Sequence, residues 1–108
     1  MKEIRAYIQP HKLSHITMEL INIPGFPGMT VSECEGFGRE RTEHGQDYKP
    51  YLPKKRIEIF APDHLVEIIF ETIMKVGHSG HHGDGKVYIL DTLKGGRIST
   101  GEQDPDLG

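Results

Sequence analysis

The sequence predicts an α+β fold in which two helices cover one face of a four-stranded antiparallel sheet. Three observations lead to this prediction. The chain has 108 residues, which fits a single domain with one core, residues 1–108. Four segments have the composition or alternation of strands, and two have apolar residues at helical spacing. The segments follow the order strand, helix, strand, strand, helix, strand, which is typical of the ferredoxin-like arrangement.

The first half of the chain supplies a strand, a helix and a second strand. Ile4, Ala6 and Ile8 alternate with charged or polar residues, as in a strand with one buried face. The apolar residues of the first helix are Leu13, Ile16, Leu20 and Ile23. Pro24-Gly25 ends that helix. The second strand is expected near residues 29–37, with Cys34 as a small core residue.

The second half begins with a long polar segment. Residues 39–53 show no apolar period, which predicts an exposed loop. A strand is expected at 56–60, a helix from Pro62 to Gly77, and a last strand at 86–90, followed by a polar tail from 92 to 108. Both helices would lie on one face of the sheet. The other face of the sheet would then have no cover from the same chain. We expect oligomerisation to cover it, because Ile4, Ala6, Ile8 and their neighbours would otherwise be poorly covered on one side or the other.

Composition and charge exclude several classes of protein. Thirteen basic residues oppose 16 acidic ones, for a net charge of −3, so no strongly basic surface is available for nucleic acid. The apolar runs are too short for a transmembrane helix. The first residues contain no apolar signal-peptide block. Cys34 is the single cysteine, which excludes an internal disulfide. We therefore expect a cytoplasmic protein.

A glycine-rich segment, residues 79–86, precedes the last strand. Gly80 to Lys86 matches G-x-x-x-x-G-K, but Val87 stands where a P-loop has Ser or Thr, and a strand follows instead of a helix. The segment is therefore not a P-loop. Its glycines and Lys86 are compatible with a phosphate cradle, and equally with an ordinary turn in which Asp84 fixes the backbone.

Five short blocks follow one another along the chain: Gly28-Met29-Thr30-Val31, Gly36-Phe37-Gly38-Arg39, Leu52-Pro53-Lys54, Gly83-Asp84-Gly85-Lys86 and Thr100-Gly101-Glu102. In this order they resemble the PII signal-transduction family. The resemblance implies a ferredoxin-like homotrimer that binds an adenine nucleotide, ATP or ADP, between neighbouring subunits. It also implies a mobile loop that controls a target protein, such as a membrane transporter or an enzyme. The departures from the family pattern at Glu40 and Ser99 favour nucleotides of lower charge, such as ADP or AMP. The nucleotide would be an effector and not a covalently held cofactor.

The resemblance also assigns nucleotide-binding residues. Gly28, Met29 and Thr30 would line the base and ribose. The phosphate contacts would come from Gly38, Arg39, Gly83, Asp84, Gly85, Lys86 and Arg97. Further contacts would come from Lys54, Glu58 and Phe60. The cations among these residues are enough for a polyphosphate.

Three departures from the family pattern indicate a divergent, PII-like member. Glu40 stands where nitrogen-sensing members carry a glutamine that helps to hold magnesium and 2-oxoglutarate, and Ser99 replaces a tail arginine. The loop after Arg39 is also shorter. These changes favour a role in inorganic-carbon, bicarbonate or ion-transport regulation, with bicarbonate as a possible small-anion ligand. A nitrogen-regulatory protein that senses ATP, ADP and 2-oxoglutarate is the alternative.

Two further functions are weighed against these. His78, His81 and His82 cluster in the sequence, as in a trimeric metal-tolerance protein, but no Cys or carboxylate set completes a metal site, and none is predicted. A small phosphohydrolase is disfavoured because no nucleophile–base pair or carboxylate pair is evident. We therefore expect a regulator and not an enzyme.

Overall fold

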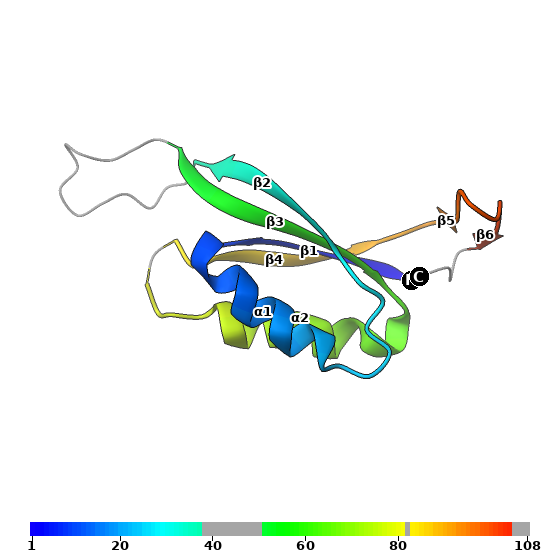
Figure 1. Ribbon diagram of the computed structural model, residues 1–108, viewed down its shortest axis with the longest axis horizontal. Coiled ribbons are helices and arrows are strands. Elements are labelled where there is room, and N and C mark those ends of the chain that lie inside the picture. The colour runs from blue at the N-terminus through cyan, green and yellow to red at the C-terminus, as the bar shows by residue number, and fades with distance from the viewer. Residues whose placement is uncertain (38–50, 82, 105–108) are drawn as a thin grey trace.

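The computed structural model describes residues 1–37, 51–81 and 83–104. The first elements are β1 (Lys2–Ile8), the 3-10 turn η1 (Pro10–Lys12), α1 (Leu13–Ile21) and β2 (Thr30–Gly36). They are followed by β3 (Leu52–Ala61), α2 (Asp63–Gly77), β4 (Gly85–Asp91) and the short strands β5 (Gly95–Gly96) and β6 (Gln103–Asp104). The predicted order of strands and helices is confirmed (Figure 1).

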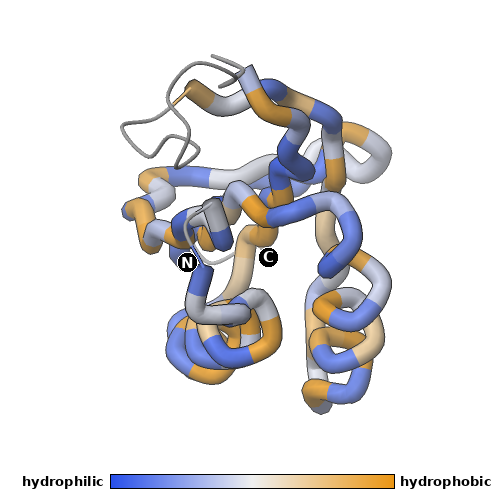
Figure 2. The backbone as a smooth tube through the Cα atoms, turned by 90° about the vertical axis from the view of Figure 1, so that its left-hand side faces the viewer, coloured by the Kyte–Doolittle hydropathy of each residue, from blue (hydrophilic) through white to orange (hydrophobic). Residues whose placement is uncertain are grey.

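The main sheet is antiparallel with the strand order β2-β3-β1-β4. β1 is central: Ile4 lies opposite Ile59 of β3 and Ile89 of β4, and Ile8 lies opposite Gly85. Both helices pack on the same face of the sheet, as Figure 2 shows from one side. This is the ferredoxin-like fold that the sequence predicts.

The core lies between the sheet and the two helices. Ile4 and Ala6 are fully buried and Ile8 is 3% exposed, together with Ile57 and Ile59 of β3. The helices contribute Ile16, Leu20, Leu65, Val66, Ile69 and Ile73. Burial of each large aliphatic side chain away from water stabilises the folded state by about 1.5–3 kcal/mol. The expectation that Ile4, Ala6 and Ile8 need cover from another subunit is therefore wrong, because the helices of the same chain bury them.

The opposite face of the sheet, which we call the open face, is mostly polar, with Phe60 and Tyr88 exposed among its polar residues. One row across it holds Thr30, Glu58, Arg5 and Tyr88. Arg5 pairs with Glu3 through two hydrogen bonds of 2.8 Å. Cys34 also lies on this face, opposite Lys54, and is half-buried. It is not the core residue that the sequence suggests.

Two boundaries differ from the sequence prediction. β3 begins at Leu52, so it includes Leu52 and Pro53, which the sequence placed in the loop. At this end β3 pairs only with β2, with Pro53 opposite Glu35, because the pairing with β1 stops at Lys55. A proline without an N–H is tolerated where one edge of a strand is unpaired. Most of the predicted loop, residues 38–50, lies outside the described residues.

The tail is more ordered than its composition suggests. β5 and β6 form a small hairpin beyond the end of β4 (Figure 1). The backbone N–H of Gly101 donates a 2.8 Å hydrogen bond to the carbonyl oxygen of Arg97 and closes the turn. Within the described ranges, neither helix has the length and apolar content to cross a membrane.

Candidate functional site

The candidate site residues fall into two groups. Lys54, Gly83, Asp84, Gly85 and Lys86 gather around the edge of the sheet where β4 begins. A second group lies toward the other end of the strands or beyond it: Gly28, Met29, Thr30, Glu58, Phe60 and Arg97. Gly38 and Arg39 lie outside the described residues.

The first group is joined by a contact between β3 and the loop that precedes β4. The ammonium group of Lys54 donates a hydrogen bond to the carbonyl oxygen of Gly83. Lys54 is half-buried, so the contact holds the loop against the sheet. Gly83 has a φ of +89° and Gly85 a φ of +107°, values that residues other than glycine rarely adopt. The loop conformation therefore depends on both glycines.

The carboxylate of Asp84 faces its own loop. It accepts hydrogen bonds from the backbone N–H groups of Ser79, at 2.7 Å, and Gly80, at 3.0 Å. It also accepts from the Ser79 hydroxyl and, at 2.9 Å, from the side-chain amide of Gln9. The hydrogen bonds from Ser79 and Gly80 stabilise the ionised form and lower the pKa of Asp84 to about 2; the bond from the Ser79 hydroxyl has the largest effect, followed by the bond from the Ser79 backbone N–H. The carboxylate is thus ionised at neutral pH. Sequence reasoning missed both Gln9 and Ser79 as neighbours of Asp84.

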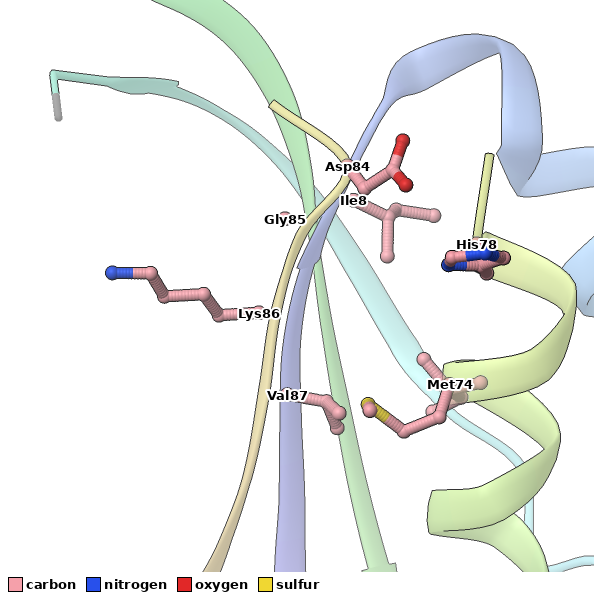
Figure 3. A pocket seen from close by; sticks show the side chains of 9 residues that line it. Ile8, Met74, His78, Asp84, Gly85, Lys86 and Val87 are labelled. Atoms are coloured by element: carbon pink, nitrogen blue, oxygen red, sulfur yellow. The ribbon is translucent and has the colours of Figure 1, made fainter. Parts of the chain in front are cut away.

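The side chain of Lys86 points away from α2, on the opposite side of β4 from the carboxylate of Asp84 (Figure 3). Lys86 lies opposite Tyr7 in the sheet, whereas Val87 and Met74 face each other on the helix side. Lys86 is exposed, and within the described part of the chain it forms no ion pair. An unpaired ammonium group beside a glycine-rich loop is suited to an anionic ligand.

A small pocket lies between α2 and the start of β4. Its volume is about 140 Å³, less than the 300–1,000 Å³ that is usual for a small-molecule site. Ile8, Ile73, Met74 and Val87 make it largely apolar, and His78 and Asp84 stand at its rim (Figure 3). Lys86 is among the residues that line the pocket, but its side chain extends away from α2 (Figure 3). The pocket does not form a nucleotide site by itself.

Gly28 and Met29 line a different hollow, formed by the connection from α1 to β2. Its volume is about 650 Å³, and Ile21 and Phe26 contribute apolar surface to it. Met29 also packs against the core. Thr30 follows at the start of β2, opposite Glu58. Glu58 accepts a 3.3 Å hydrogen bond from Arg56, so its charge is partly balanced within the sheet.

Arg97 is far from Lys86 within one chain. β4 continues for five residues from Lys86 to Asp91, which corresponds to about 17 Å of strand, and Arg97 lies in the hairpin beyond (Figure 1). There its guanidinium lies 3.7 Å from the Glu102 carboxylate. A single chain therefore does not bring the two predicted phosphate contacts together.

The histidine cluster is only partly described. His81 lies 3.2 Å from the Ser79 hydroxyl, and His82 lies outside the described residues. In the residues that the structure places, no three His, Cys, Asp or Glu side chains are grouped to hold a metal ion.

The fold and these residues define a class of small α+β proteins with a ferredoxin-like sheet. The family described as "Nitrogen regulatory protein P-II" matches residues 1–102. The chain is 42% identical to Nitrogen regulatory protein P-II 1 of Escherichia coli K12, over 96% of both chains. It is 41% identical to Nitrogen regulatory protein P-II of Klebsiella oxytoca, over 96% of both chains, and 40% identical to that of Haemophilus influenzae, over 98% of both. The chain belongs to the P-II family of regulatory proteins, as its sequence blocks indicate.

Proposed function

We propose that this P-II family protein is a cytoplasmic homotrimer that binds ADP, AMP or ATP between neighbouring subunits. In this proposal the nucleotide is an effector that is bound reversibly, and the segment between β2 and β3, which includes most of the loop that the sequence predicts, transmits its presence to a target protein. The observation that carries the proposal is Lys86, which stands exposed and without an ion pair in the described chain, directly after the loop that Lys54 fastens to the sheet.

The separation of Lys86 from Arg97 supports a shared site. Each group alone offers too few cations for a polyphosphate, which is best held by several charged donors. The tail of one subunit, with Arg97, would have to reach the β4 loop of the next. Cyclic symmetry would then build three equal sites from three chains.

The open face supports the oligomer for a reason that the sequence did not supply. Phe60 and Tyr88 are 44% and 48% exposed on this face. Covering aromatic side chains removes apolar surface from water, so a facing subunit that packs on the open face would be stabilising.

The regulated process is open between two alternatives. Glu40 in place of glutamine, Ser99 in place of arginine and the short loop favour control of inorganic-carbon, bicarbonate or ion transport. The names of the relatives favour nitrogen regulation, the alternative in which 2-oxoglutarate would be sensed together with ATP and ADP. In both, the protein is a regulator and not a catalyst, and neither involves nucleic acid.

Calorimetry and light scattering test the proposal. We expect a particle with about three times the mass of the 12.2 kDa chain, and saturable binding of ADP at one nucleotide per chain. A monomer at micromolar concentration would overturn the trimer. The absence of binding for ADP, AMP and ATP would overturn the nucleotide site.

A further inference from the structure

The side chain of Asp84 joins the start of its own loop, at Ser79 and Gly80, to Gln9, which is 75 residues away in the sequence. Ser79 and Gly80 follow the end of α2, Gln9 follows the end of β1, and Asp84 precedes β4. The link to Gln9 is a consequence of register. Ile8, the last residue of β1, lies opposite Gly85, the first residue of β4. Gln9, which follows β1, therefore lies close to Asp84, which precedes β4.

The hydrogen bonds use the full capacity of the carboxylate. An ionised carboxylate offers about four acceptor positions, and Asp84 receives donors from the Ser79 hydroxyl, the Ser79 and Gly80 backbone N–H groups and the Gln9 amide. A carboxylate that is satisfied in this way has no remaining need for a ligand. Its charge is also offset by the donors that surround it.

The carboxylate of Asp84 also points away from the side on which a phosphate would bind. Figure 3 shows the carboxylate on the side of β4 that faces α2 and His78, whereas Lys86 extends to the opposite side. Asp84 therefore lies behind the loop with respect to the cation that would attract a phosphate. Lys54 fastens the same loop from β3 through the carbonyl oxygen of Gly83.

We propose that Gln9, Ser79 and Asp84 form a positioning network that holds residues 79–81, 83 and 84 in a phosphate-binding conformation, and that the carboxylate of Asp84 does not contact the nucleotide. The inference rests on the proposed nucleotide site and adds Gln9 and Ser79 to it. A loop that is ordered before binding loses less entropy when the ligand arrives. The network would therefore act on affinity for the phosphates and not on recognition of the base.

Asp84→Asn separates this role from simple electrostatics. If Asp84 were only a negative charge near the phosphates, its removal would tighten ADP binding or leave it unchanged. In a positioning role, the asparagine oxygen could still accept from the N–H groups of Ser79 and Gly80, but its NH2 group would replace the oxygen that accepts from Gln9 and the Ser79 hydroxyl, and the charge that strengthens all four bonds would be lost. ADP binding would then weaken by about tenfold. The matched control is Asp91→Asn, which removes the charge of the same residue type at the other end of β4, where it pairs with Lys2. It should leave ADP affinity unchanged.

Ser79 provides a second test that leaves the charge of the loop intact. Ser79→Ala should weaken ADP binding several-fold, whereas Ser79→Thr, which keeps the hydroxyl, should retain the affinity. Because both residues act in one network, Ser79→Ala combined with Asp84→Asn should bind ADP about as well as Asp84→Asn alone. Gln9→Ala, which also removes no charge, should weaken ADP binding as well.

Calorimetry should compare ADP with adenosine for each variant. The losses should appear for ADP and be absent for adenosine, a selectivity that general destabilisation would not produce. Hydrogen exchange at the Ser79 and Gly80 amides should also be faster in Asp84→Asn. Equal or tighter ADP binding by Asp84→Asn, or equal losses for adenosine, would overturn the network while leaving the nucleotide site in place. If the wild-type protein binds no adenine nucleotide, the proposed function and the inference fail together.

Discussion

The backbone carbonyl of Tyr7 occupies the space that a side chain at Gly85 would need. A Cβ atom at Gly85 would overlap the carbonyl oxygen of Tyr7 and lie 2.9 Å from its carbonyl carbon. The sequence suggests that Gly85 allows backbone amides to approach a phosphate. The structure gives it a separate reason, which is the close approach of β1 and β4 where their pairing begins.

Gly85→Ala should therefore lower the free energy of unfolding by about 2–4 kcal/mol, because overpacking against backbone adds to the strain of a positive φ. Gly28→Ala is a matched control: its φ of +103° is close to the +107° of Gly85, but no atom lies within 4 Å of the added Cβ. It should cost about 1–2 kcal/mol. Urea unfolding at one fixed protein concentration measures both, and equal losses would contradict the steric account.

Lys86→Ala should weaken ADP binding by about 10- to 150-fold, because it removes a charge-assisted contact worth about 1.5–3 kcal/mol. Lys75→Ala removes the same charge from the last turn of α2 and should leave the affinity unchanged. Substitutions within 42–47 should have smaller effects than Lys86→Ala. Calorimetry would refute the assignment if the Lys86 and Lys75 variants bound equally well.

The contribution of Asp84 to stability should depend on pH in one direction. Its pKa falls from 3.8 to about 2 on folding, so the folded protein favours the ionised form. The stabilisation should be complete above about pH 4 and should disappear as the pH falls through about 2. The difference in unfolding free energy between the wild type and Asp84→Asn should shrink over that interval. A difference that stays constant down to pH 2 would show that ionisation of Asp84 is not involved.

Glu40 can be tested without reference to its position. If its carboxylate disfavours 2-oxoglutarate, the wild-type affinity for MgATP should be insensitive to 2-oxoglutarate. Glu40→Gln should then make the binding of MgATP tighter when 2-oxoglutarate is present, since a repulsion of a few kcal/mol at about 4 Å is removed. A tenfold effect of 2-oxoglutarate on the wild type would restore nitrogen sensing as the leading interpretation.

The sequence was sufficient for the fold because local patterns determine it. Ile4, Ala6 and Ile8 alternate strictly, and the apolar stripe of α2 repeats at helical spacing, so the elements and their order follow from periodicity. Periodicity does not reveal which face of a strand the helices cover. The placement of Cys34 on the open face and of Leu52 within β3 depends on pairing with neighbouring strands.

The candidate site was predictable in part. Lys86 and the glycines are visible as a cluster in the chain, but Gln9 and Asp84 are 75 residues apart. Their contact follows only from the antiparallel pairing of β1 with β4. The predicted ferredoxin-like fold includes that pairing. Placing the end of β1 beside the start of β4 would therefore have identified Gln9 as a neighbour of Asp84. The hydroxyl of Ser79 depends on the conformation of a loop, which no sequence period encodes.

The most direct test of a site shared between subunits is to mix two inactive variants. Lys86→Ala chains and Arg97→Ala chains, each weak in ADP binding, should be unfolded together in equal amounts and refolded. If Lys86 of one subunit and Arg97 of the partner subunit hold the same phosphates, about a quarter of the sites in the random trimers will carry both intact residues. Calorimetry should then detect ADP binding of wild-type affinity at about that fraction of the chains. A refolded mixture with no site of wild-type affinity, or an Arg97→Ala protein that already binds ADP normally, would contradict the shared site.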